Sequence, residues 1–243
     1  MKYNDNIVIL FCYNVEKYLP EVCDKIIKSN ILKFSDVLFI DDGSDDNTIA
    51  VIDAFIQKFK NASKIENKNN SGYGINYKIS IDHVLKNNYK KLVFLHGDGQ
   101  YPAHKVEELL EKLDKNDFCQ ASRFINKKSA YKNMPNLRIF ANRLLTLFIN
   151  CLFRDNSTEY FSGFRGFNVK VFEDLNLNKF QNRWIIEQEM HFYFLIKKYK
   201  TIEIEIETTY GDRVSLVPPI KYTLDVIITS IKFFLIKIKF VRL

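Results

Sequence analysis

The residues best suited to chemistry form an acidic turn, Leu95-His96-Gly97-Asp98-Gly99-Gln100-Tyr101-Pro102, which follows the apolar run Leu92-Val93-Phe94-Leu95. A carboxylate just past the end of a buried strand, flanked by glycines that let the backbone approach a ligand, suits a metal-bound diphosphate. Asp98 is therefore the first candidate for chemistry. Gly-Asp-Gly is also an ordinary turn sequence, so the alternative of a plain loop stays open at this point.

A second acidic cluster follows the apolar run Val37-Leu38-Phe39-Ile40, where Asp41 and Asp42 precede a Gly-Ser pair. A carboxylate fixed at such a strand end can accept hydrogen bonds from a base N–H or a ribose hydroxyl. The alternative is a group of helix N-cap residues, an interpretation that fits Asp45 to Asn47.

The elements that must position these turns alternate along the first 120 residues. Helix-type spacing runs from about Glu16 to Lys28 and from about Asn47 to Phe59. Strand-type runs are expected at Ile7–Cys12, Val37–Ile40, Leu92–Leu95 and Phe118–Ala121. This alternation predicts an α/β fold with a mostly parallel sheet flanked by helices. Because ligands gather beyond the carboxyl ends of such strands, the Tyr13-Asn14, Asp41–Ser44 and His96–Asp98 segments are expected to converge on one edge.

The second half of the chain supplies fewer patterns. A polar, Lys-rich stretch from about Asn126 to Asn136 is expected to be a loop or lid, and helical spacing resumes from Leu137 to Phe153. Strict alternation over Ile202–Glu207 is typical of a half-exposed edge strand. We therefore expect one domain over residues 1–219 and a separate C-terminal helix over 220–243.

That C-terminal segment is apolar but interrupted by charged residues, and its charge-free runs are too short to span a bilayer. An amphipathic helix lying in the membrane interface is one interpretation. A helix packed on its own domain, or against another chain in a homo-oligomer, is the other.

Composition limits the function classes. A net charge of +7 favours anionic partners, but no element carries a basic cluster interleaved with aromatic residues, so nucleic-acid binding is not expected. The four cysteines, Cys12, Cys23, Cys119 and Cys151, show no Cys-x-x-Cys pairing and are expected to be small buried residues in a reducing compartment. The N-terminal residues carry no signal segment, which favours a cytoplasmic protein.

Five segments taken together resemble family 2 glycosyltransferases, because they occur in the order seen in that family. They are Tyr13–Leu19, Asp41–Thr48, Asn70–Gly74, Gly97–Pro102 and Ser162–Phe167, the last reading Ser-Gly-Phe-Arg-Gly-Phe. The resemblance covers roughly residues 5 to 225 and is strongest to the dolichyl-phosphate-mannose synthases and related bacterial polyprenyl-phosphate sugar transferases. It implies a GT-A, Rossmann-like nucleotide-diphospho-sugar transferase fold.

The resemblance also implies residue roles. It assigns Asp98 and Gln100 to a Mg²⁺ or Mn²⁺ site. It assigns the nucleotide and its diphosphate to Tyr13, Asp41, Asp42, Gly72, His96 and Gly97. Arg165 is implied to face a donor or acceptor phosphate, and Arg213, in Tyr210-Gly211-Asp212-Arg213, to close on the diphosphate.

Two glutamates, Glu187 and Glu189, fall where the family has acidic groups near the acceptor. A spacing of two puts them about 200° apart on a helix, so only one is expected to face the site. A solvated helix face is the alternative for these glutamates, and a surface ion pair is the alternative for Arg165 and Arg213. Arg138 and Arg143 are weaker candidates for holding an acceptor phosphate.

The sequence departs from the family pattern at two positions. Phe11 replaces a proline, which matters little, whereas His96 replaces the first aspartate of the Asp-x-Asp metal site. Asp98 with the diphosphate could still hold Mg²⁺, and an imidazole would suit Mn²⁺ better. His96 could also bind a phosphate or be a bystander at the strand end.

The function these features imply is an inverting, metal-assisted glycosyltransferase that uses a nucleotide-diphosphate sugar. The expected acceptor is a polyprenyl phosphate or lipid-linked glycan at the inner face of the cell membrane, in cell-envelope polysaccharide biosynthesis, with peripheral membrane contact. If the acceptor were a hydroxyl, Glu187 or Glu189 would take its proton. The alternative is a catalytically silent nucleotide-sugar binding or scaffold protein, suggested by His96.

Overall fold

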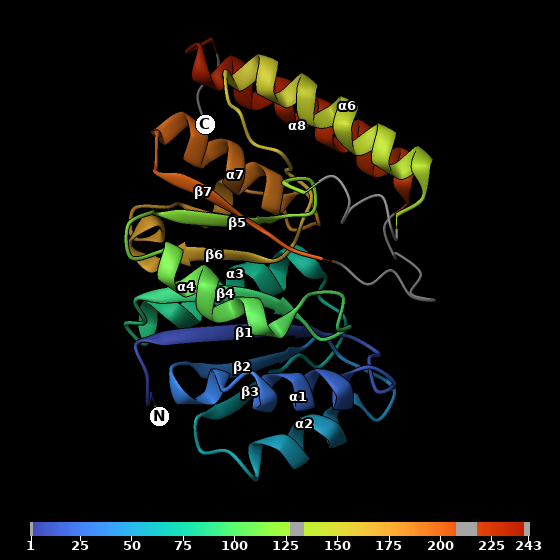
Figure 1. Ribbon diagram of the computed structural model, residues 1–243, viewed down its shortest axis with the longest axis vertical. Helices are drawn as coiled ribbons and strands as arrows, with labels where there is room; N and C mark the ends of the chain where they lie inside the picture. The colour runs from blue at the N-terminus through green and yellow to red at the C-terminus, as the bar shows by residue number, and fades with distance from the viewer. Residues whose placement is uncertain (1, 127–133, 208–217, 241–243) are drawn as a thin grey trace.

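A single seven-stranded sheet forms the centre of the protein, and the computed structural model describes residues 2–126, 134–207 and 218–240 (Figure 1). The strands are β1 (Asn6–Cys12), β2 (Asp36–Asp41), β3 (Ala62–Glu66), β4 (Lys91–His96), β5 (Phe118–Ser122), β6 (Arg165–Asn168) and β7 (Thr201–Glu205). Their order across the sheet is β3-β2-β1-β4-β6-β5-β7. Only β6 is antiparallel to its neighbours, so the predicted mostly parallel α/β sheet is confirmed.

Helices cover both faces of the sheet. They are α1 (Leu19–Lys28), α2 (Thr48–Ile56), α3 (Tyr73–Lys86), α4 (Val106–Lys112), α6 (Asn136–Phe153), α7 (Ile186–Lys197) and α8 (Pro219–Lys237), with short 3₁₀ turns at Ile31–Lys33, Ala103–Lys105, Val169–Phe172 and Leu177–Lys179. Successive strand residues point to opposite faces. Val8 and Leu10 of β1 therefore join the core under α1, α2 and α4, whereas Ile7 and Ile9 join the core under α3 and α7.

The alternating pattern over Ile202–Glu207 predicted an edge strand, and β7 is indeed the last strand of the sheet. The helices expected at 16–28 and 47–59 begin and end within three residues of α1 and α2. Two predicted segments, most of the 126–136 loop and all of Tyr210–Arg213, lie outside the described residues.

The structure corrects one expectation about burial. Cys12, Cys23 and Cys119 are buried, but Cys151 is exposed. It lies on α6, whose buried face is made by other residues, Ile139, Leu145, Ile149 and Phe153. In the part of the chain that the structure describes, no helix is both long and apolar enough to cross a membrane.

Candidate active site

The carboxyl ends of β1, β2 and β4 are tied together by backbone hydrogen bonds. The Asp42 N–H donates to the Cys12 carbonyl at 2.9 Å, and the Gly97 N–H donates to the Phe11 carbonyl at 3.0 Å. The acidic segment after β2 and the acidic turn after β4 therefore lie on either side of the end of β1. Tyr13, half-exposed, continues directly from this end.

Asp41, the last residue of β2, and Asp42, the next residue, fix the neighbouring loops through hydrogen bonds. Asp41 is fully buried, and its Oδ2 accepts the N–H groups of Gly43 and Ser44 at 3.1 and 3.0 Å. Asp42 Oδ1 accepts the Ser71 N–H at 2.7 Å, and Oδ2 accepts the Gly72 N–H at 3.0 Å. Asp42 Oδ1 also accepts the Asn67 side-chain amide at 3.0 Å, so Asp42 fixes the loop that leads into α3.

Gly43 makes this loop arrangement possible. Its φ is +72°, a conformation that residues with a Cβ rarely adopt, and a Cβ there would lie 2.7 Å from the carbonyl carbon of Asn69. The chain can bring the 69–72 loop against the end of β2 only because this position is glycine.

The turn after β4 presents Asp98 as a half-buried carboxylate. Its Oδ1 accepts the Gln100 N–H at 3.0 Å, and its Oδ2 has no hydrogen bond to the described residues. Among those residues, no group of three or more His, Cys, Asp or Glu side chains could hold a metal ion by itself. Asp98 and Gln100 suit Mg²⁺ or Mn²⁺ only when substrate phosphates and water complete the ligand set, which is usual for Mg²⁺.

His96 is enclosed by aromatic rings. The ring centroids of Phe11, Tyr73 and Tyr101 lie 6.1, 5.9 and 5.1 Å from that of His96, all in edge-on geometry. A Cβ on Gly163 would lie 2.8 Å from His96 Cε1, so the histidine fits because residue 163 is glycine. Its Nε2 lies 3.4 Å from the Tyr73 hydroxyl oxygen, which connects it to the next group.

Glu187 is the acidic group on α7 beside His96. The Tyr73 hydroxyl donates to Glu187 Oε1 at 2.6 Å. Burial, followed by the Glu187 carboxylate, raises the pKa of Tyr73 well above its ordinary value, so the hydroxyl stays protonated and donates. Tyr73 was missed from the sequence; its position directly after Gly72 in the Asn70–Gly74 motif is the signal that could have found it.

Glu189 lies on the other side of α7. Its carboxylate is fully buried, accepts the Gln181 N–H at 2.7 Å, and lies 3.8 Å from the Lys232 ammonium of α8. Burial raises its pKa. The spacing argument therefore separated the two glutamates correctly, but neither forms a solvated helix face.

The arrangement of Arg165 differs from what the resemblance implied. Its side chain is 0% exposed, and it donates to three backbone carbonyls: Nε to Ser162 at 2.8 Å, Nη1 to Glu187 at 2.6 Å and Nη2 to Tyr160 at 2.7 Å. Its Nη2 also lies 4.0 Å from Glu187 Oε2, so the ion pair that Arg165 forms is buried and not on the surface. The guanidinium holds the backbone of Glu187 against the chain that enters β6.

A second buried arginine was missed entirely. Arg123, just after β5, forms a buried ion pair with Glu159, and the Arg123 N–H also donates to Glu159 Oε2 at 2.8 Å. Glu203 of β7 accepts the neighbouring Thr158 N–H. These contacts fasten the chain before β6 to the far strands of the sheet.

The other predicted arginines lie elsewhere. Arg138 and Arg143 are exposed on α6, with the Arg143 guanidinium 5.8 Å from the centre of the Phe124 ring. Arg213 lies outside the described residues.

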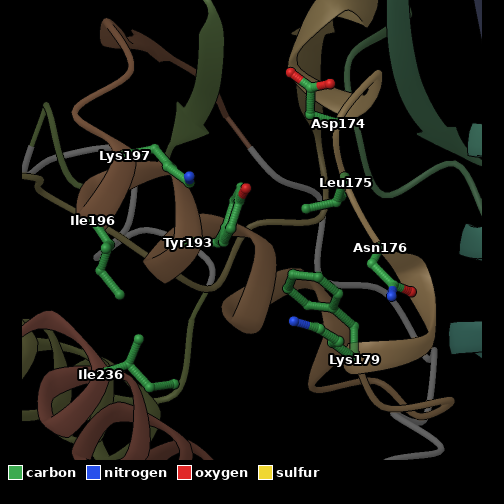
Figure 2. Close-up of a pocket in the computed structure, with 9 residues that line it drawn as sticks. Asp174, Leu175, Asn176, Lys179, Tyr193, Ile196, Lys197 and Ile236 are labelled. Carbon is green, nitrogen blue, oxygen red and sulfur yellow. The ribbon is translucent and has the colours of Figure 1, made fainter. Parts of the chain in front are cut away.

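A pocket of about 360 Å³ lies away from this site, between α7, the end of α8 and the 174–180 segment (Figure 2). Tyr193 and Lys197 of α7 and Asp174 are among its lining residues. Because β6 runs antiparallel, from Arg165 opposite Phe94 to Asn168 opposite Lys91, the chain after β6 lies at the amino edge of the parallel strands. The pocket is therefore at the opposite edge of the sheet from Asp98.

Comparisons with known proteins identify the family of the chain. The model of glycosyl transferase family 2 matches residues 7–176. An uncharacterized protein of Methanocaldococcus jannaschii is 26% identical over 240 residues, covering 93% of this chain and 98% of that protein. A dolichyl-phosphate beta-glucosyltransferase of Dictyostelium discoideum is 33% identical over 128 residues, covering 46% of this chain and 38% of the other.

Solved structures share the fold at low identity. Glucosyl-3-phosphoglycerate synthase from Mycobacterium tuberculosis, in complex with uridine diphosphate, has a TM-score of 0.68 at 14% identity, over 94% of this chain and 79% of that one. The same enzyme with Mn²⁺, UDP-glucose and phosphoglyceric acid gives 0.67 at 14% identity, with the same coverage. Because the family model covers well over half of the sequence, the chain belongs to glycosyl transferase family 2 and is a nucleotide-sugar glycosyltransferase with a GT-A-like fold.

Proposed function

We propose that the protein transfers a sugar, with inversion, from a nucleotide-diphosphate sugar to a polyprenyl phosphate at the inner face of a membrane. The observation that carries the proposal is the meeting of the Asp42 loop, the Asp98 turn and Glu187 of α7 around the end of β1. His96, two residues before Asp98, lies 3.4 Å from the Tyr73 hydroxyl, which donates to the Glu187 carboxylate of α7.

On the donor side, Tyr13 and Asp42 would bind the base and ribose, and the turn of Gly97 and Asp98 would bind the diphosphate. Asp98 and Gln100 would hold a divalent cation together with the substrate phosphates. When bound, the cation supplies positive charge to the leaving diphosphate as the bond to the sugar breaks. A fold neighbour whose structure contains Mn²⁺ and UDP-glucose supports this assignment.

On the acceptor side, a lipid phosphate is already ionised at neutral pH, so its oxygen can attack the sugar without a strong general base. The name of the Dictyostelium relative, a dolichyl-phosphate glucosyltransferase, supports this class of acceptor. Arg165 would act as a positioning residue by fixing the Glu187 backbone.

A lipid-linked glycan is the second candidate acceptor, and Glu187 is the observation that favours it. A sugar hydroxyl needs a carboxylate to take its proton, and Glu187 lies beside His96 with an orienting hydrogen bond from Tyr73. Glu189 accepts the Gln181 N–H on the other side of α7, so we assign it no role with either candidate acceptor.

The first test is a thermal-shift panel of nucleotide diphosphates and their sugars, with Mn²⁺ and with Mg²⁺. A ligand that binds only the folded state raises the apparent melting temperature, so the panel identifies the donor. Transfer of labelled sugar from that donor is then measured to polyprenyl phosphate, to the matching alcohol without phosphate, and to a lipid-linked glycan. We expect product from the phosphate only.

The same assay separates the enzyme from a silent binding protein. If the donor binds but neither cation supports transfer or donor hydrolysis, the transferase proposal is wrong. Product from the glycan, with loss of activity in Glu187→Gln, would select the second candidate.

A further inference from the structure

Helices α6 and α8 lie side by side as an outer layer over α7, at the top of Figure 1. Their ends match, because the Lys237 ammonium near the end of α8 donates to the carbonyls of Leu152 and Phe153 at the end of α6, at 3.4 and 2.6 Å. The two helices therefore run parallel. Both begin on the side of the molecule where the carboxyl ends of β1 and β4 lie (Figure 1).

Each of these helices exposes a row of large apolar side chains. The rows consist of Leu137, Phe140, Leu144 and Leu147 on α6, and Ile220, Leu224, Ile228 and Ile231 on α8, each between 44% and 81% exposed. Spacings of three and four residues put each row on one side of its helix. The opposite sides are buried through Ile149 on α6 and Phe233 on α8, so both rows face away from the protein. We call the eight residues the α6–α8 apolar face.

The exposed charged residues of the two helices are mainly basic. Exposed basic residues of the two helices and their ends are Arg138, Arg143, Arg154, Lys221, Lys232 and Lys239. From 136 to 154 the sequence contains no acidic residue, and from 219 to 240 it contains only Asp225. Asp225 is half-buried and lies 3.8 Å from the Arg183 guanidinium. A large apolar surface with a basic rim is the pattern of an interfacial membrane contact.

We propose that the α6–α8 apolar face lies flat on an anionic lipid bilayer, with the apolar rows among the acyl chains and the basic rim at the headgroups. Anionic headgroups attract such a rim, whereas a second copy of this chain would bring two basic rims together. The charge pattern therefore favours lipid over a homodimer. The inference rests on the proposed function in one respect. A polyprenyl phosphate lies in a membrane, and docking of the α6–α8 apolar face would bring the active site to that membrane.

Vesicle co-sedimentation of the whole chain tests the proposal. We expect binding to phosphatidylcholine vesicles containing a quarter phosphatidylglycerol to be at least about tenfold tighter than to phosphatidylcholine alone, and to weaken as salt is raised. The double variant Leu144→Gln/Ile228→Gln should lose about tenfold or more of that binding. Equal binding by the variant and the parent protein would overturn the proposal.

A matched pair of single variants shows whether the loss of binding depends on where the exposed isoleucine lies. Ile231 on the apolar face and Ile27 on α1 are 44% and 43% exposed. Ile231→Gln should weaken vesicle binding, and Ile27→Gln should not. Circular dichroism checks that each variant is folded.

Sedimentation velocity without vesicles tests whether a second copy of the chain covers the α6–α8 apolar face instead. A dimer that Leu144→Gln/Ile228→Gln dissociates, combined with no vesicle binding, would assign the face to a second copy and overturn the proposal.

Donor thermal shifts on the same variants keep the two proposals apart. Vesicle binding without any donor shift would count against the proposed function alone, and a donor shift without vesicle binding would count against the docking surface alone.

Discussion

The proposed donor side and the proposed acceptor side of the site are organised by different kinds of contact. On the donor side, Asp41 and Asp98 accept backbone N–H groups only two or three residues along the chain, and Asp42 accepts those of the short 71–72 turn. On the acceptor side, Glu187 is oriented by Tyr73, 114 residues away, and by the buried guanidinium of Arg165. Turns can therefore be recognised as motifs, whereas the acceptor side exists only after the chain has folded.

The difference also affects stability. A buried charged side chain that supplies several hydrogen bonds leaves unpaired groups behind when it is changed. Substitution of a carboxylate at an open turn lowers the free energy of unfolding less, because water can solvate the groups that lose their partner. Substitutions on the acceptor side should thus lower stability and activity together, whereas substitution of the half-buried Asp98 on the donor side should lower activity alone.

The largest expected effect is that of Arg165→Lys. A lysine cannot reproduce three hydrogen bonds to separate carbonyls, so we expect the free energy of unfolding to fall by about 3–5 kcal/mol. Urea denaturation measures the change. Arg183→Lys is the control, because that side chain is 45% exposed and its replacement should cost no more than about 0.5 kcal/mol. Equal losses in the two variants would remove the contrast between the two sides.

Asp98→Asn tests the donor side. We expect transfer to fall by about 100-fold, since the variant loses negative charge where the cation and diphosphate would bind, while urea denaturation stays unchanged. Steady-state transfer at saturating donor measures the effect. Asp45→Asn, an exposed acid three residues past Asp42, should leave transfer unchanged. Full activity of Asp98→Asn would contradict its assignment.

Glu203, on β7, gives the stability of the protein a pH dependence. Burial is the main cause that raises its pKa to about 7, whereas a glutamate in the unfolded chain titrates near 4.5. The contribution of Glu203 to stability is therefore fully present below about pH 4.5 and is lost as the pH rises through about 7, by about 3 kcal/mol in all. Urea denaturation across this range should show the decline in the parent protein and a flatter profile in Glu203→Gln. Identical profiles would exclude Glu203 as its source.

The smallest effect concerns the hydrogen bond from Tyr73 to Glu187. Tyr73→Phe removes only the hydroxyl, and we expect kcat/KM to fall by about tenfold. Combined with Glu187→Gln, it should cost little more than Glu187→Gln alone, because the two residues share one interaction. Tyr77→Phe is the matched control on α3, since the buried Tyr77 hydroxyl has no hydrogen-bond partner among the described residues. Additive losses would show that the two side chains act separately.

Sequence reasoning found the parts of the molecule that local rules determine. Apolar runs ending in Cys12, Ile40 and Leu95 indicated strands, and the polar residues after them do meet at one edge. The 200° separation of Glu187 and Glu189 followed from helix geometry alone. Each of these inferences needs only neighbouring residues and the period of the element.

The inferences that failed needed knowledge of long-range packing. The sequence could not show that Arg165 would be enclosed by carbonyls of Tyr160, Ser162 and Glu187. Helical spacing identified α6, but two apolar sides compete on that helix, and the side through Ile149 is the buried one. Which side faces inward depends on α7 and α8, which come later in the chain.

The Lys237 contact changes how the end of the chain should be regarded. Helix carbonyls at a C-terminus are left without partners by the helix itself, and here a lysine from a different helix serves those of α6. The helix α8 thus caps the end of α6, and a chain cut before Lys237 would leave the carbonyls of Leu152 and Phe153 without this donor. Helix α8 up to Lys237 is consequently a poor place to trim the protein, although it follows every sequence motif of the transferase.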